Sequence, residues 1–295
     1  MVVILVLAVA ARAEQKNVKL LTGLTDLELQ RTMNLMRASI GTHCDYCHVI
    51  KEEWDFASDE KPQKVRAREM MRMVMEINRS TFGGQSVVSC YTCHRGSPHP
   101  VTLVALPQAP PPFPTPLPEK PQLLDAKDVI AKYAAALGDA SRLKLPRVLK
   151  GERINSRGSV PIEVIEKDGK VRMTVDGKRI PPADVSTAYA IVMPSEIAEG
   201  AKTIAKENDQ WVVARGNQRF YFDAASGLLV RTVLLTPRPV GTIPQQTDYE
   251  DYRDVGGTKF PFRVRVSMVD PWSSAARQYT SVELGAAVED AVFEP

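Results

Sequence analysis

Two short stretches, Cys44-Asp45-Tyr46-Cys47-His48 and Cys90-Tyr91-Thr92-Cys93-His94, contain all four cysteines of this 295-residue chain. Both follow the pattern Cys-x-x-Cys-His, in which two thiols can add to the vinyl groups of a haem. The histidine that follows is then placed under the iron as its proximal ligand. Because the pattern occurs twice, we expect two haem c groups. The expected attachment points are Cys44, Cys47, Cys90 and Cys93, and the expected proximal ligands are His48 and His94.

Other uses of paired cysteines fit this pattern less well. A disulfide framework does not require a histidine after each second cysteine, and a redox Cys-x-x-Cys does not usually come twice in so short a span. Zinc could take two cysteines and a histidine at each copy, but it would need a fourth ligand. Haem attachment is therefore the preferred interpretation.

A methionine-bearing helix is predicted ahead of the first motif. Thr25-Asp26-Leu27-Glu28 has the signature of a capping box, which opens a helix that runs to about Ser39 and is ended by Gly41. Apolar residues recur along it at intervals of four, three and four, so they share one face, which we expect to look toward the first haem. These residues are Leu29, Met33, Met36 and Ile40.

The second motif has a similar helix before it. Ser58-Asp59-Glu60 precedes a helical stretch that extends through about Asn78, and Gly83-Gly84 breaks the pattern. Only one thioether can bind each iron as the sixth ligand, so most methionines of the two helices must fill the core instead. In this second helix the candidates are Met70, Met71, Met73 and Met75.

These residues resemble the cytochrome c subunit of photosynthetic reaction centres, whose repeat is a helix with an axial methionine, a turn and Cys-x-x-Cys-His. The resemblance covers about residues 17 to 103, and it implies that the ligand methionines are Met33 and Met70. The chain carries two such units where the best-known members carry four. The loop Phe82-Gly83-Gly84-Gln85 also offers no histidine, although the corresponding loop of those members supplies one ligand.

Histidine and methionine on both irons would leave no open position for a substrate. We therefore expect a multihaem c-type cytochrome that transfers single electrons and is not an enzyme. The expected partner is a redox protein or a membrane electron-transfer complex, and the resemblance makes a photosynthetic reaction centre one candidate. Two alternatives stay open: a subunit that self-assembles into a haem-containing conducting filament, and a dihaem peroxidase.

The first residues favour export to the periplasm or beyond the cell. Val2 to Ala11 is an apolar run that ends in the small-x-small pattern Ala11-Arg12-Ala13, so residues 1–13 are predicted to be a signal segment, although the usual basic residues at its start are missing. The run is about half of the ~20 residues that a membrane span needs. The net charge of +3 is too near balance to indicate a nucleic-acid partner.

Domain boundaries follow from proline content. Eight prolines lie between Pro107 and Pro121, so we predict a dihaem domain over residues 14–105, a semi-rigid linker over 106–122 and a second domain over 123–295. In the second domain Asp125 is predicted to cap a helix over 126–137, which Gly138 closes. The remainder reads as strands separated by turn signals. The predicted strands are 148–154, 160–166, 170–175, 211–215, 219–222, 228–235, 247–252, 262–268 and 278–284.

The stretches Phe220–Leu229 and Asp248–Tyr252 resemble segments of the periplasmic lipoprotein-carrier fold. That resemblance implies an antiparallel β half-barrel with helices, and hence an α+β fold class for the whole chain. It also implies a concavity that could take a lipid or another apolar ligand, while a docking domain without a ligand is the alternative. This domain has no histidine and no cysteine, and no catalytic constellation is predicted in it.

Overall fold

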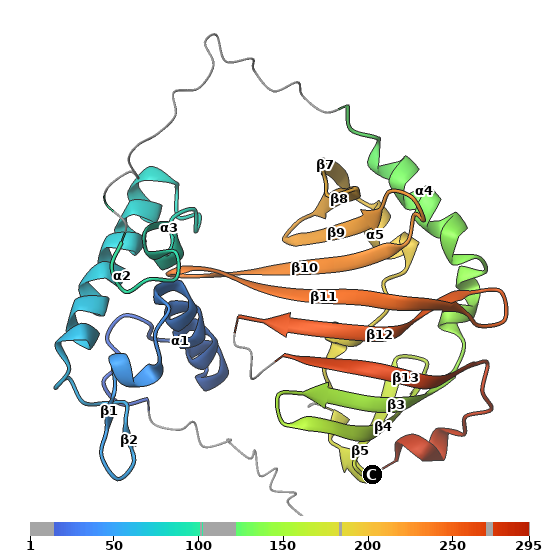
Figure 1. Cartoon of the computed structure of the whole chain (residues 1–295), viewed down its shortest axis with the longest axis horizontal. Coiled ribbons are helices and arrows are strands. Elements are labelled where there is room, and N and C mark those ends of the chain that lie inside the picture. The colour runs from blue at the N-terminus through green and yellow to red at the C-terminus, as the bar shows by residue number, and fades with distance from the viewer. Residues whose placement is uncertain (1–14, 101, 103–121, 183–184, 270–273, 295) are drawn as a thin grey trace, which may run out of the picture. The chain divides into compact units, whose positions relative to one another are not determined.

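The structure is a computed structural model of the chain, and it describes residues 15–100, 102, 122–182, 185–269 and 274–294 (Figure 1). The predicted signal segment and residues 106–121 of the predicted linker lie outside the described residues. The chain divides into two compact units. The first ends at Leu106 and also takes in Pro237–Ile243, and the second contains the rest. The fold class is α+β, as predicted.

Helix α1 (Asp26–Ile40) of the first unit begins and ends where the sequence predicts. The hydroxyl of Thr25 accepts a hydrogen bond from the Glu28 amide at 3.3 Å, and the Glu28 carboxylate accepts one from the Thr25 amide at 3.0 Å. These reciprocal bonds complete the capping box. Gly41 ends the helix with a φ of +66°, a backbone conformation that glycine adopts without strain.

Helix α2 (Pro62–Thr81) starts with a proline at its first position and ends three residues beyond the predicted Asn78. Asn78 is buried, and its side chain explains the extension. Its amide oxygen accepts hydrogen bonds from the amides of Val87 and Val88, at 3.1 and 2.8 Å, and thereby holds the loop that follows the helix. The helix can therefore run on to Thr81 before Gly83 and Gly84 turn the chain.

Short elements connect and follow these two helices. Between them lie a 3₁₀ turn and the two-stranded hairpin of β1 and β2, and after them comes the short helix α3. Their bounds are Cys44–Tyr46 for the turn, Val49–Ile50 for β1, Trp54–Asp55 for β2 and Cys90–His94 for α3.

The core of the first unit includes a segment that is distant in sequence. Val240, which is completely buried, packs with the buried residues Leu21 and Met71. The Ser86 hydroxyl donates to the carbonyl of Arg238 at 2.9 Å, and the Arg238 guanidinium pairs with a carboxylate of α1 at 3.2 Å. Residues Pro237–Ile243 are thus an integral part of this unit, which the sequence did not predict.

The second unit is built on an open antiparallel sheet that has eleven strands within the described residues (Figure 1). The strand order is β6-β5-β4-β3-β13-β12-β11-β10-β9-β8-β7, so nearly all neighbours in the sheet are neighbours in sequence. The strands are β3 (Arg147–Asn155), β4 (Gly158–Lys167), β5 (Lys170–Val175), β6 (Lys178–Ile180), β7 (Lys202–Glu207), β8 (Gln210–Arg215), β9 (Gln218–Asp223), β10 (Leu229–Arg238), β11 (Gly241–Asp254), β12 (Lys259–Met268) and β13 (Ala275–Leu284).

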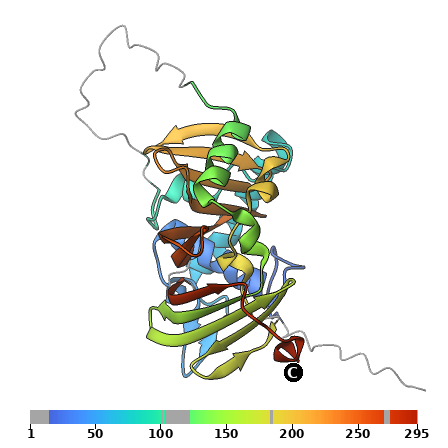
Figure 2. The same ribbon diagram turned by 90° about the vertical axis from the view of Figure 1, so that its right-hand side faces the viewer.

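Helix α4 (Ala126–Leu137) lies across one face of this sheet (Figure 2) and buries its apolar side there. Its caps are the predicted Asp125 and Gly138. Tyr133 is fully buried, its ring lies 5.3 Å from that of Phe222, and its hydroxyl donates to a backbone carbonyl at 2.7 Å. The hydroxyl is therefore satisfied inside an apolar core. Shorter helical segments complete the unit: Ala140–Lys144, Thr187–Tyr189, α5 (Pro194–Ala198) and Asp290–Phe293.

Candidate functional site

Both Cys-x-x-Cys-His motifs adopt a helical turn. In the first, the amides of Cys47 and His48 donate to the carbonyl of Cys44 at 3.2 and 2.9 Å. The second motif forms helix α3. Residues three and four apart lie on the same side of a helical turn, so each pair of thiols and its histidine can address one flat group. None of the four cysteines is paired in a disulfide.

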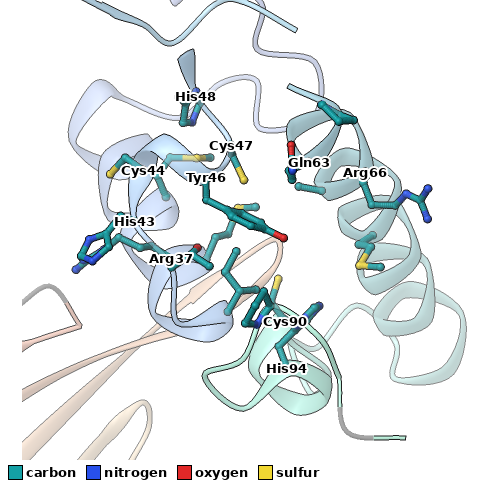
Figure 3. A pocket seen from close by; sticks show the side chains of 18 of the residues that line it. Arg37, His43, Cys44, Tyr46, Cys47, His48, Gln63, Arg66, Cys90 and His94 are labelled. Atoms are coloured by element: carbon teal, nitrogen blue, oxygen red, sulfur yellow. The ribbon is translucent and has the colours of Figure 1, made fainter. Parts of the chain in front are cut away.

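A cavity of about 380 Å³ brings the two motifs together (Figure 3). It takes its lining from α1, α2, α3 and the first motif. Seven of the eight residues predicted to hold haem line this one cavity: Met33, Cys44, Cys47, His48, Met70, Cys90 and His94. The eighth, Cys93, is exposed and is not part of this lining. The volume lies in the range of about 300–1,000 Å³ that is usual for bound organic groups.

A second cavity of about 700 Å³ adjoins the first. The two share six lining residues, which are Met33, Met36, Cys47, His48, Phe56 and Ala67. His48 therefore borders both spaces. The first unit thus offers two adjacent volumes, each bordered by a motif histidine and by candidate methionines.

The two motif histidines differ in their surroundings. Nδ1 of His94 lies 2.9 Å from the carbonyl oxygen of Ser97, a contact that places the proton on Nδ1 and leaves Nε2 free to bind a metal. Burial lowers the pKa of His48, and the positive charge of Lys64 lowers it further, so this ring stays neutral near pH 7. The Phe56 ring meets His48 edge-on, with centroids 5.1 Å apart.

The inner thiol of each pair is partly buried. Burial raises the pKa of Cys47 and of Cys90, so both remain protonated near neutral pH. Such thiols are poor nucleophiles, and this suppresses thiol–disulfide exchange. Cys44 and Cys93 are exposed, so each pair joins one sheltered thiol to one accessible thiol.

The methionines of α2 differ in burial and in the cavity that they line. Met70 lines the cavity that holds both motifs, whereas Met71 is buried in the core with Leu21 and Val240, and Met73 is 50% exposed. Met75 packs at the edge of that core. Met71 also borders the larger cavity, together with Cys47 and His48, so Met70 is the methionine of α2 that lies beside both motifs.

On α1 the geometry does not choose between two candidates. Met33 and Met36 both line both cavities, and both pack against the core of the unit. The preference for Met33 therefore still rests on the family resemblance. Of the remaining histidines, His43 lines the smaller cavity and His99 is exposed in the loop after the second motif.

Sequence reasoning missed an aromatic wall. Trp54 and Phe56 stack with centroids 5.4 Å apart and planes only 4° from parallel, and both border the larger cavity. They are 46% and 56% exposed, which is unusual for large apolar side chains. The spacing of two aromatic residues along a short strand, with side chains alternating, was the available signal.

It also missed a charged cluster beside the same cavity. Lys64 and Arg68 are more than nine-tenths buried, and both pair with Asp59, at 3.2 and 2.8 Å. Burial would raise the pKa of the Asp59 carboxyl, but hydrogen bonds from Arg68, Lys19 and Lys64 outweigh it and hold that pKa well below its usual range. Lys64 also donates to three backbone carbonyls between residues 56 and 58. The cluster fastens α2 to the segment that follows β2.

Two further findings concern the described residues alone. No group of three or more histidine, cysteine, aspartate or glutamate side chains among them is placed to hold a metal ion. None of the helices in that part of the chain is long and apolar enough to cross a membrane.

Comparison with known proteins supports the resemblance of the N-terminal part. Residues 7–120 match the family described as photosynthetic reaction centre cytochrome C subunit. Cytochrome c-554 of Chloroflexus aurantiacus is 35% identical over 89 residues, which are 28% of this chain and 21% of that protein. The reaction center cytochrome c subunit of Rubrivivax gelatinosus is 36% identical over 105 residues, 33% of this chain and 28% of that protein. The chain therefore spans less than a third of these relatives.

Solved structures align with the sheet-containing part at low similarity. A LolA superfamily protein of Nitrosomonas europaea aligns with 58% of this chain and 98% of its own, at 10% identity and a TM-score of 0.36. A putative outer membrane lipoprotein-sorting protein domain from Vibrio parahaemolyticus gives 11% identity and the same TM-score. These scores are too low to support an argument about this chain. The N-terminal part, by contrast, is similar to reaction centre cytochrome c subunits.

Proposed function

We propose that the first unit is a dihaem c-type cytochrome domain that carries single electrons. The observation that supports this most strongly is the smaller cavity, which both Cys-x-x-Cys-His motifs line together with candidate methionines from both long helices. Residues that are up to 61 positions apart, from Met33 to His94, meet there. A disulfide or zinc role would give no reason for thioethers to share this lining.

Each haem would be held in the same manner. Thioether bonds to Cys44 and Cys47 would attach one haem, and bonds to Cys90 and Cys93 the other. His48, His94, Met33 and Met70 would be the side chains that ligate the irons. The bound haem would supply one-electron iron chemistry, with methionine sulfur favouring the ferrous state.

The surrounding side chains would shelter the porphyrin faces and set their environment. Trp54 and Phe56 would provide an apolar wall along the larger cavity. Lys64 and Arg68 border the same space with positive charge, which suits the carboxylate edge of a porphyrin. With both axial positions filled by protein side chains, no site would remain for a substrate, and the domain would not act as an enzyme.

Electrons would pass between the two haems within the first unit. The two cavities share six residues, so groups bound in them would lie close together. We propose a membrane electron-transfer complex outside the cytoplasm as the partner. The relatives named as reaction center cytochrome c subunits make a photosynthetic reaction centre the first candidate to test. We also propose residues 14–105 as the extent of the haem-binding segment, 106–122 as a linker, and 123–295 as the second domain, apart from Pro237–Ile243, which belong to the first unit.

Spectroelectrochemical titration of the purified, exported protein tests the proposal. Two one-electron waves of equal amplitude are expected, both at the higher potentials of histidine and methionine ligation. A matched variant, Cys44→Ser with Cys47→Ser, should lose one wave and half of the haem absorbance. Absorbance equal to one haem per chain in the unaltered protein would contradict two haems, and rapid carbon monoxide binding to the reduced protein would contradict six-coordinate irons.

A further inference from the structure

The turn between β10 and β11 is buried, although turns and loops usually lie at the surface. We call the seven residues Pro237–Ile243 the arm, and all of them belong to the first unit. Val240, at the turn of the arm, is completely buried in the core of that unit. Cys90 of the second motif packs against the same core, as do Met33 and Met36 of α1. The arm therefore shares a core with residues proposed to hold haem.

Gly241 of the arm lies against the residue that precedes the second motif. A Cβ atom added at Gly241 would lie 2.8 Å from Cβ of Ser89 and 3.3 Å from a terminal methyl group of Leu35 on α1. Two carbon atoms do not approach to 2.8 Å, so the backbone of the arm comes this close because residue 241 has no side chain. Ser89 is the N-cap of α3, and Cys90 follows it directly. The arm thus limits where the second motif can lie.

Two polar contacts of Arg238 hold the arm in this place. Its carbonyl accepts a hydrogen bond from the hydroxyl of Ser86, in the segment before the second motif, at 2.9 Å. Its guanidinium pairs at 3.2 Å with the carboxylate of Glu28, in the first turn of α1. The side chain of Arg238 is only 17% exposed, so water and salt screen this ion pair less than they would a surface pair. The arm therefore links α1, which carries the methionine proposed for one haem, to the motif proposed for the other.

We infer that the arm is a positioning element of the second haem site: it holds the second motif against α1 and limits the access of water to Cys90. This inference rests on the proposed function. Ferric haem carries one more positive charge than ferrous haem, and water stabilises the more charged state, so an apolar environment raises the reduction potential. Loosening the arm should therefore lower the potential of the haem attached to Cys90 and Cys93. In this way residues 237–243, between β10 and β11, would contribute to the redox properties of the first unit.

Spectroelectrochemical titration of the full haem-loaded chain with Val240→Ala tests this role. One of the two reduction waves should move to lower potential, and it should be the wave that survives in the Cys44→Ser, Cys47→Ser variant. Val164→Ala is the matched control, because Val164 is also completely buried but lies on β4 in the core of the second unit. Both variants remove the same two methyl groups from a core, so both should lose stability, yet only Val240→Ala should move a wave. The inference is wrong if neither variant moves a wave, if both do, or if the other wave moves.

A rescue experiment separates positioning of the motif from a general loss of packing. Gly241→Ala should lower the same wave, because the new Cβ would displace Ser89. Adding Ser89→Gly removes the atom that this Cβ would meet, and glycine replaces a serine N-cap at small cost, so the double variant should regain the original potential. Gly158→Ala is the control for backbone strain, since Gly158 has a φ of +124° and an added Cβ there would have nothing within 4 Å. It should leave both waves in place.

The haem content of each protein separates failure of this inference from failure of the proposed function. Two haems per chain in the unaltered protein and in Val240→Ala, with both waves unmoved, would overturn the role of the arm alone. Fewer than two haems in the unaltered protein would overturn the proposed function instead. If Gly241→Ala lowers the wave and Ser89→Gly does not restore it, the arm only stabilises the fold and does not position the motif. If Gly241→Ala does not fold, the comparison of Val240→Ala with Val164→Ala decides.

Discussion

Replacing Met70 by leucine probes the ligand set at one iron. Leucine conserves volume, so packing around α2 should be kept at a cost below about 1.5 kcal/mol, while the thioether is lost. The ferric protein should show a near-infrared charge-transfer band from sulfur to iron. Because two sites with one thioether each contribute to this band, Met70→Leu should halve its intensity. The reduction potential of the affected haem should also fall, since methionine favours ferrous iron.

Two neighbouring methionines serve as controls for that experiment. Met73 is 50% exposed and lines neither cavity, whereas Met71 is 7% exposed and borders only the larger cavity, not the one that contains both motifs. Their leucine variants should keep the full band, although Met71→Leu can lower stability slightly. If Met71→Leu halves the band and Met70→Leu leaves it intact, the reasoning from the cavity lining is refuted.

Three further perturbations test the packing of the first unit. Asp59→Asn should destabilise the protein at pH 7. The pKa of Asp59 is lower in the folded state than in the unfolded state, so its carboxylate adds to the free energy of unfolding above the ordinary carboxyl range. That stabilisation is lost as the pH falls below about 4. Unfolding curves of the variant should therefore lack part of the acid-induced loss of stability. Val240→Ala removes two fully buried methyl groups, worth ~0.8 kcal/mol each, plus a cavity term, so urea unfolding should show a loss of about 2 kcal/mol. In Gly41→Ala the new Cβ would lie 2.0 Å from the carbonyl oxygen of Gly96, and residue 41 would have to keep a φ of +66°. Thermal unfolding should therefore show a loss of stability of at least ~1 kcal/mol. An unchanged melting midpoint would contradict this close approach.

Local signals in the sequence predicted much of the fold. The capping box at Thr25 and Glu28 fixed the start of α1, and Asp125 with Gly138 fixed both ends of α4. In each case the hydrogen bonds that begin or end the helix come from side chains within a few residues, so the information is local.

Two strands of the large sheet were missed because their sequences lack a buried face. β6 (Lys178–Ile180) has three residues and pairs only with β5. β7 (Lys202–Glu207) is the other edge of the sheet, and its Ile204 is 48% exposed. Edge strands bury few side chains, so their apolar alternation is weak.

The hairpin of β10 and β11 extends further than predicted. Pro237 and Pro244 interrupt the β pattern of the sequence, so the predicted strands stopped at residue 235 and resumed at 247. The burial of Val240 beside Met71 joins positions that are 169 residues apart. No local sequence pattern predicts such a contact.

In the candidate site, too, some residues could be predicted from local sequence and others could not. The cysteines and histidines follow from a motif whose chemistry requires adjacent residues, and these were predicted by number. The stacked pair of Trp54 and Phe56 and the buried pair of Lys64 and Arg68 become evident only when α2 and the β1–β2 hairpin are placed around the same cavity. Their roles depend on tertiary structure, which sequence spacing does not encode.

The mass of the intact protein, recorded before and after extraction with acidified acetone, tests covalent attachment of two haems most directly. The expected value is that of the polypeptide plus two haems, with the red colour remaining on the protein after extraction. A mass equal to the bare polypeptide, or colour that passes into the acetone, would contradict the proposal.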